Sequence, residues 1–346
     1  MSTPASPPAY TSARRVTSAT PLSLWASVIG LCLLLLIASM PWWAERSTLR
    51  LGTEFLCVLA LAQMWNLLAG YGGLASMGQQ AFVGLGAYCL VVFGLQWGLP
   101  VFWIVPVAGV IGALVAVPTA LVVFRLRGAY FAIGTWVVAE VIRILVMLDP
   151  LIQGETGTSL IALNAVEPEL RRSVGYWFAL AALAGMALAM AVLLRSHVGT
   201  AAKAIGDDDE AAASLGVRVL RTRQAIYVLA AFGAALAGVA WLASAITFLP
   251  RTNFGVQWSV LMLFMVLVGG LRSGPGPYIG ALLLFALQEF LGDFGAWYLA
   301  GLGAAAAGCA LFLPQGLWGA LSPRLARLFN RPRISPVSHP QERTAP

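Results

Sequence analysis

The chain has 346 residues, of which 60% are hydrophobic and only 10% are charged, whereas a typical soluble domain is about 25% charged. Apolar segments of roughly the length that crosses a bilayer recur along the whole sequence, so a soluble enzyme with a single membrane anchor is excluded. The net charge of +7 comes from basic residues placed between these segments, and it requires no nucleic-acid partner.

Backbone polar groups in hydrocarbon must be hydrogen-bonded within the protein, which leaves only helix bundles and closed barrels. The Leu, Ala and Val runs are continuous and lack the alternation of a barrel strand. The sequence therefore predicts an all-α polytopic transmembrane bundle with broken or re-entrant segments.

We predict about ten spans within a permease domain at 22–321, flanked by disordered tails at 1–21 and 322–346, the second of them basic. The third span follows a glycine-rich passage at 70–88 and ends near Trp97. The other nine are predicted at 22–40, 53–69, 101–124, 130–148, 174–194, 224–248, 256–270, 276–291 and 296–313.

Basic residues are enriched on the cytoplasmic side of membrane proteins. With ten spans and both termini in the cytoplasm, that side receives 15 of the 21 basic residues: Arg14, Arg15, Arg125, Arg127, Arg195, Lys203, Arg218, Arg221, Arg223, Arg272, Arg324, Arg327, Arg331, Arg333 and Arg343. The outer side receives 5, namely Arg46, Arg50, Arg171, Arg172 and Arg251, and Arg143 falls within a span. The asymmetry favours this orientation.

The long polar stretch at 195–223 is then a cytoplasmic loop, for which we predict two short helices. Thr200 is the expected cap of the first and Gly206 its end, whereas Asp207 is the expected cap of the second and Gly216 its end. A charged run of this kind can also be a solvated connector. The only lysine, Lys203, follows TAA rather than the glycines of a phosphate-binding loop, so ATP-driven transport would need ATPase subunits docked on this loop.

Two glycine-interrupted regions, 70–86 and 269–280, predict broken helices of the kind that line solute sites. The polar residues near them and in the fifth span are our candidates for the translocation path: Gln63, Asn66, Ser76, Gln79, Gln80, Thr135, Glu140 and Arg143. The glycines can equally serve close packing, and the amides can bond across helices. For Glu140 and Arg143, three residues apart in one span, a structural ion pair is the favoured interpretation.

The cysteines Cys32, Cys57, Cys89 and Cys309 lie in apolar segments without CxxC spacing, and the two histidines are far apart. This pattern indicates neither a disulfide framework nor a metal site.

Four motifs in order resemble the membrane subunits of branched-chain amino acid ABC importers, the Liv-type permeases, and among them the LivM-like member of the pair. They are WNLLAGYGGLASMGQQAFVGLGAY, LRGAYFAIGTWVVAEVIR, AIGDDDEAAASLGV and VGGLRSGPGPYIGALLL, and the similarity covers 56–313. In the third motif Gly206 stands where the family commonly has arginine. The resemblance implies a non-catalytic permease of the bacterial inner membrane, with a second permease, two ATPase subunits and a periplasmic solute-binding protein as partners.

The same resemblance implies that the loop carries the coupling helix, with ATP and magnesium bound only by the ATPase subunits. The implied coupling residues are Lys203, Ala204, Ile205, Asp207, Asp208, Asp209, Glu210, Leu215 and Gly216. Relatives with this pattern also serve urea and amides, which leaves such a permease as an alternative. Less favoured are a secondary transporter driven through Glu140 and Arg143, and an intramembrane prenyltransferase-like enzyme using the aspartate cluster.

Overall fold

The computed structural model describes residues 14–15, 35–160, 168–291, 294–313, 315–321 and 335–336. The chain divides into a large unit, Ala38–Ala320, and a small unit formed by Met1–Ile37 with Leu321–Pro346. In the small unit, strands β1 (Arg14–Arg15) and β4 (Ser335–Pro336) pair antiparallel. Most of the predicted first span at 22–40 and of both predicted disordered tails lies outside the described residues.

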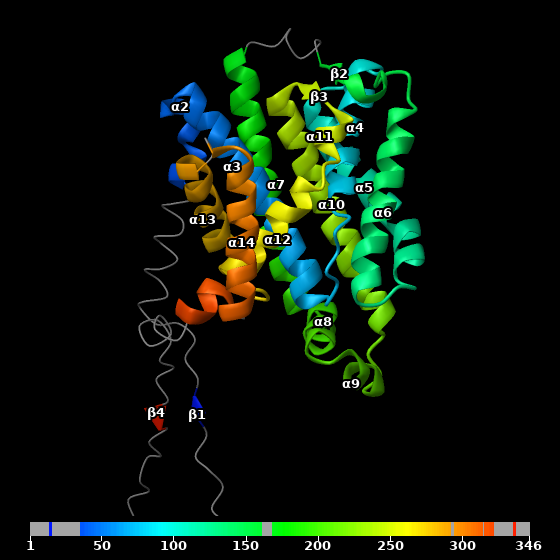
Figure 1. The fold of residues 1–346 in the computed structure, drawn as a ribbon, viewed down its shortest axis with the longest axis vertical. Coiled ribbons are helices and arrows are strands. Elements are labelled where there is room, and N and C mark those ends of the chain that lie inside the picture. Colours follow the sequence, from blue (N-terminus) through cyan, green and yellow to red (C-terminus); the bar gives the residue numbers. More distant parts are fainter. Residues whose placement is uncertain are drawn as a thin grey trace, which may run out of the picture. The chain divides into compact units, whose positions relative to one another are not determined.

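The large unit is built from helices (Figure 1). They are α2 (Met40–Trp43), α3 (Arg46–Trp65), the π-helix η1 (Asn66–Tyr71), α4 (Gln80–Leu95), α5 (Val101–Val123), α6 (Ala129–Met147), the 3₁₀-helix η2 (Gly154–Thr156), α7 (Pro168–Arg195), α8 (His197–Asp207), α9 (Asp209–Ser214), α10 (Val219–Ala245), α11 (Pro250–Asn253), α12 (Gln257–Gly269), α13 (Gly276–Leu291) and α14 (Ala296–Phe312). Two short strands, β2 (Thr158–Ser159) and β3 (Thr247–Phe248), complete it.

Six helical segments among the described residues are long and apolar enough to cross a membrane, and three more are apolar but shorter. The six are 46–71, 101–123, 129–147, 169–195, 219–245 and 250–269, and the three are 80–95, 276–290 and 300–312. These nine segments match the nine predicted spans that follow 22–40. The all-α polytopic bundle is confirmed, while the count of ten stays a prediction.

Several predicted span boundaries are wrong in the same direction. The helix predicted from 53 begins at Arg46, and the one predicted from 174 begins at 168. Arg46 and Glu169, at the two helix starts, form an exposed ion pair with an N–O distance of 2.9 Å. Span prediction counts apolar residues, so it misses the polar turns by which a helix continues into the interfacial region.

The helix of the seventh span begins at Val219 rather than at 224, and it ends at Ala245 rather than at 248. Ile246 adopts a positive φ of 69°, which a β-branched residue does not adopt inside a helix. The chain then forms β3, whose Thr247 pairs with Ser159 of β2. A β-pair therefore fastens the loop after α6 to the end of α10.

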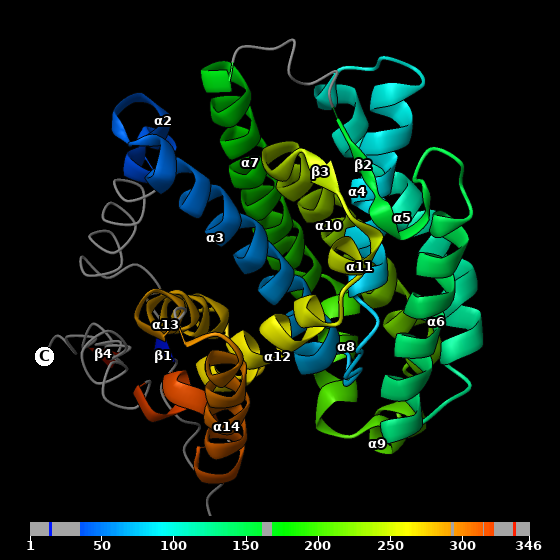
Figure 2. The same cartoon turned by 45° about the horizontal axis from the view of Figure 1, so that its top comes forward.

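The core lies where α3, α4, α10 and α12 meet, whereas most residues of α5, α6 and α7 are not buried. Figure 2 shows how these helices are arranged. One face of α10 consists of the small residues Ala230, Ala234 and Gly238, and it is buried. A Cβ on Gly238 would lie 2.0 Å from the Val83 carbonyl oxygen of α4. This face therefore lets two backbones approach closely, as small residues do in membrane helix pairs.

Both predicted helix breaks are present. The α-helical geometry of α3 changes to the π-helix η1, and residues 73–76 form no regular secondary structure before α4 begins. The second break follows α12, where Gly270 and Arg272 have positive φ values of 126° and 61°. The glycines around this second break are packed tightly, since a Cβ on Gly269 would lie 1.9 Å from the Gly276 carbonyl oxygen.

Candidate functional site

Two regions of the large unit contain the predicted functional residues. Helices α8 and α9 lie together at one end of the bundle, and β2, β3 and α11 lie toward the opposite end (Figure 1). The first region is the predicted coupling loop at 195–223. The second is a cavity on the side of β3 and α11.

The coupling loop contains the two predicted helices, but three of its four predicted ends are wrong. Ser196, not Thr200, is the N-cap residue of α8, and Thr200 donates a hydrogen bond to the His197 carbonyl within the first turn. Gly206 remains helical, so α8 continues to Asp207. The predicted left-handed end of α9 is confirmed by Gly216, with a φ of 85°.

The N-cap of α9 is Asp208, one residue later than predicted. Its Oδ1 accepts hydrogen bonds from the backbone amides of Glu210 and Ala211, both at 3.0 Å. These are the amides that an N-cap side chain normally satisfies. The register shifts by one because α8 keeps Asp207 in its last turn, so only Asp208 has the extended backbone that an N-cap requires.

The predicted coupling residues differ in exposure. Ile205 is buried and anchors α8 to the bundle, whereas Lys203 and the acids at 207–210 are exposed. Leu215 is 84% exposed at the end of α9, so its side chain is not buried within the large unit.

Two of the acids hold arginines from elsewhere in the bundle. A carboxylate oxygen of Asp207 lies 2.8 Å from Nη2 of Arg272, and one of Asp209 lies 3.2 Å from Nη2 of Arg223. Exposed pairs of this kind contribute little stability by themselves. They do keep Asp207 and Asp209 directed at arginines of the bundle, and Glu210 and Leu215 stay available to a partner.

The second region is a cavity of about 1180 Å³ between α3, α4, α6 and the segments α10 to α14. It slightly exceeds the roughly 300–1,000 Å³ of a typical small-molecule pocket, so it has room for a small solute. Its lining combines charged and amide side chains with three tryptophans. These are Glu54, Gln80, Glu140, Arg143, Glu155, Arg251, Gln257 and Gln288, together with Trp136, Trp241 and Trp258.

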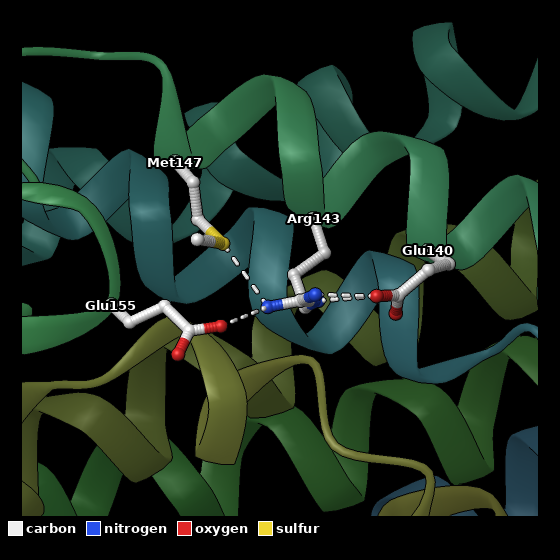
Figure 3. Close-up of polar contacts among 4 residues, drawn as sticks. All are labelled: Glu140, Arg143, Met147 and Glu155. Atoms are coloured by element: carbon white, nitrogen blue, oxygen red, sulfur yellow. Dashed lines mark hydrogen bonds and ion pairs between the residues drawn. The ribbon is translucent and has the colours of Figure 1, made fainter.

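Glu140 and Arg143 meet at this cavity, and Glu155 in the loop after α6 supplies a third charge (Figure 3). Nε of Arg143 donates to Oε1 of Glu140 at 2.9 Å, while Nη1 lies 3.5 Å from Oε1 of Glu155. Nη1 also lies 3.0 Å from the sulfur of Met147, one turn further along α6. The guanidinium is therefore already surrounded by partners, as the structural interpretation of the pair requires.

Of the other path candidates, only Gln80 lines the cavity, and it accepts a 2.6 Å hydrogen bond from Ser259 of α12. Gln63 donates to the hydroxyl of Tyr278, and Thr135 accepts a hydrogen bond from the backbone amide of Met77.

The remaining candidates lie within the first break. Ser76 accepts from the amide of Gly78, and its carbonyl accepts from the indole of Trp65. Asn66 bonds to the backbone of the second break. Gln79 is buried, and neither atom of its amide has a partner in the part of the chain that the structure describes. Cross-helix bonding thus accounts for most of these polar groups, and their role in transport stays a prediction.

Sequence reasoning missed several residues that line the cavity. Glu54 is the clearest, because it is a carboxylate within the predicted second span and such residues mark functional positions. Glu155 and Arg251 lie between predicted spans. Hydrophobic periodicity gives no signal there, so the sequence could not show that both residues reach the cavity.

Residues 47–313 match the family described as "Branched-chain amino acid transport system / permease component". The chain belongs to this family. The match spans the bundle from α3 to the end of α14, and it extends the resemblance seen in the four motifs toward the N-terminus. This member of the family is a multi-pass membrane protein and a transport subunit rather than an enzyme.

Two relatives are named as permease proteins. The chain is 28% identical over 319 residues to the high-affinity branched-chain amino acid transport system permease protein LivM of Escherichia coli K12. It is 27% identical over 321 residues to the protein of the same name in Salmonella typhimurium LT2. Each alignment covers 85% of this chain and 75% of the relative. No solved structure matches the chain.

Proposed function

We propose that the chain is one of two permease subunits of an ATP-driven importer of branched-chain or related amino acids in a bacterial inner membrane. The observation that carries this proposal is the family match over 47–313. Helices α8 and α9 support it, because they present exposed charges and an exposed leucine at one end of the bundle. The energy then comes from two ATPase subunits, which bind the ATP and magnesium, so this chain needs no cofactor of its own.

The coupling loop supports the ATPase part of the proposal. Asp207, Asp208 and Asp209 are each occupied by a contact within the chain, so Glu210 and Leu215 are the groups best placed to enter an ATPase groove. Burying an exposed Leu side chain contributes about 1.5–3 kcal/mol. Such a contact is strong enough to matter for assembly.

The cavity supports the transport part. Carboxylates and guanidinium groups in its wall keep it hydrated, and charged side chains are too costly to leave facing lipid. Such a lining admits a zwitterion, while the tryptophans offer an apolar surface for an aliphatic side chain. The uncovered side of the cavity is where a second permease subunit would close the path, and a periplasmic binding protein would deliver solute at its outer end.

The test is affinity purification of the tagged chain in mild detergent, with Leu215→Asp as the test variant and Leu215→Met as its matched control. We expect the wild-type chain and Leu215→Met to retain two ATPases and a second permease, and to hydrolyse ATP. Leu215→Asp should lose most of the ATPase subunits, because a buried carboxylate replaces an apolar contact.

Recovery of the wild-type chain alone, without ATPase activity, would contradict the importer assignment. Uptake of radiolabelled leucine, valine, urea and acetamide by vesicles containing the intact complex then identifies the solute. We expect uptake of the amino acids, and transport of urea or acetamide alone would replace the proposed solute with an amide.

A further inference from the structure

The residue that joins the coupling loop to the helix breaks is Arg272, which lies between α12 and α13. Its Nη1 donates to the Gly206 carbonyl at 3.1 Å, and its Nη2 donates to the Lys203 carbonyl at 3.3 Å. Both carbonyls belong to the last turns of α8. The Gly206 carbonyl lies in the last turn and has no i+4 amide within the helix, so the guanidinium satisfies it and also interacts favourably with the negative end of the helix dipole.

The backbone of Arg272 is held just as firmly at the other side. Its amide donates to Oδ1 of Asn66 at 2.9 Å, and Nδ2 of Asn66 donates to the Ser273 carbonyl at 2.9 Å. The hydroxyl of Tyr71 donates to the Arg272 carbonyl at 2.9 Å. Asn66 and Tyr71 are the first and last residues of η1, so one residue connects both ends of the π-helix to α8.

Glycines stand where η1 approaches Arg272 and α8, and a side chain at either glycine would be crowded. A Cβ on Gly70 would lie 2.9 Å from the amide nitrogen of Arg272, and one on Gly206 would lie 3.2 Å from the Tyr71 carbonyl oxygen. Arg272 itself adopts a φ of +61°, which costs energy for a residue with a side chain. Strain of this kind persists only where surrounding contacts hold it, as the hydrogen bonds to Asn66 and Tyr71 do here.

A second arginine makes a parallel connection. Nε of Arg223, on α10, donates to the Gly72 carbonyl at 3.2 Å, and its Nη2 pairs with Asp209 of α9. Both helices of the coupling loop are therefore tied to the segment that contains η1. π-Helical segments occur frequently at functional sites, and η1 continues the helix α3 that lines the cavity.

We propose that Arg272 is a positioning residue that transmits movement of α8 to η1, acting as a strut between the coupling loop and the two helix breaks. This inference rests on the proposed function and deepens it by naming the link. It also assigns Asp207 to the strut rather than to the ATPase-docking surface. The carbonyl bonds carry the connection, because Asp207 is largely exposed and an ion pair of that kind is weak.

The experiment uses the full chain in complex with its ATPases, reconstituted in liposomes. Arg272→Gln removes the positive charge and the planar guanidinium that donates to two carbonyls at once. Arg272→Lys keeps the charge near Asp207 but cannot reproduce that planar pair of donors. Arg221→Gln is the matched control, because Arg221 is an exposed arginine of α10 that forms no ion pair within the described residues. Three quantities are measured: ATPase subunits retained, ATP hydrolysed and solute taken up.

We expect both Arg272 variants to retain the ATPases and to hydrolyse ATP, while solute moved per ATP falls about 2- to 30-fold, the usual range for a change in coupling. Arg221→Gln should behave as wild type. If Arg272→Gln does not yield folded protein, Arg272→Lys carries the test, since it preserves the length and charge of the side chain.

Three results would overturn the strut. Normal uptake per ATP in the Arg272 variants would show that the contact is not needed for transmission. Loss of the ATPases from folded Arg272 variants would show that Arg272 shapes the docking surface instead. A wild-type chain that recovers no ATPase would end the proposed function and the strut together, whereas the first two results leave the importer assignment intact.

Discussion

At the scale of single residues, the three consecutive aspartates of the coupling loop have three different roles. Asp207 pairs with Arg272, Asp208 caps α9 and Asp209 pairs with Arg223. The residue type is the same in each case, so the roles follow from which helix end or neighbouring helix each carboxylate faces. Only Asp208 acts within its own helix, and that makes its contribution the simplest to measure.

Asp208→Ala should destabilise α9 locally by about 1 kcal/mol, the usual cost of losing an N-cap. The expected observation is faster hydrogen exchange at the amides of Glu210 and Ala211, which donate hydrogen bonds to Asp208 in the wild-type chain. Asp208→Asn is the control, because the asparagine oxygen is an equally good cap. Unchanged exchange in Asp208→Ala would show that the cap does not hold this helix.

The pair formed by Glu140 and Arg143 can be tested with a double-mutant cycle. Arg143→Gln alone should lower the melting temperature, because it leaves Glu140 without its partner. The double variant Glu140→Gln/Arg143→Gln should recover most of that loss, with a coupling energy of about 0.5–3 kcal/mol. Uptake in the double variant separates the roles: retained uptake indicates a structural pair, and lost uptake indicates a solute site.

At the scale of elements, close approach between backbones decides how the helices pack. The α4–α10 contact is one example, since Gly86 of α4 faces the Ala235 carbonyl and Gly238 of α10 faces the Val83 carbonyl. Because glycine has no side chain, each of these positions lets the other helix approach more closely than a Cβ would allow. Dispersion contacts between helices in a membrane depend on such proximity.

Gly238→Ala should lower the thermal stability of the purified protein, because the new methyl group overlaps a backbone carbonyl that cannot move freely. Overpacking of this kind typically costs about 1–3 kcal/mol. Gly185→Ala in α7 is a matched control, since a Cβ there meets nothing within 4 Å. We expect a lower melting temperature in detergent for the first variant only, and equal values for both would contradict the packing argument.

At the scale of the whole molecule, the proposed orientation places the coupling loop in the cytoplasm and the cavity mouth outside. Single cysteines test this directly. In cells, Thr156→Cys in the loop after α6 should react with a membrane-impermeant thiol reagent, whereas Ser214→Cys on α9 should react only after the inner membrane is permeabilised. Both positions are exposed, so reaction at Ser214→Cys in intact cells would reverse the topology.

The sequence by itself determined the membrane class, the helical fold, both helix breaks and the position of the coupling loop. Each of these depends on local composition: apolar runs, glycines and a polar stretch of 29 residues at 195–223. Local patterns also predicted that the loop contains two short helices, and the resemblance in the four motifs predicted the family.

The tertiary structure decided what the individual polar residues do. Asn66 and Gln63 are predicted to line the path, but Asn66 bonds to the second break and Gln63 to Tyr278 of α13. Glu54 of α3 and Glu155 of η2 line the cavity. Asp208 rather than Asp207 became the cap because α8 extends past Gly206, whose lack of a side chain lets Tyr71 and Arg272 approach. Such outcomes depend on contacts between segments some 200 residues apart, which no local pattern records.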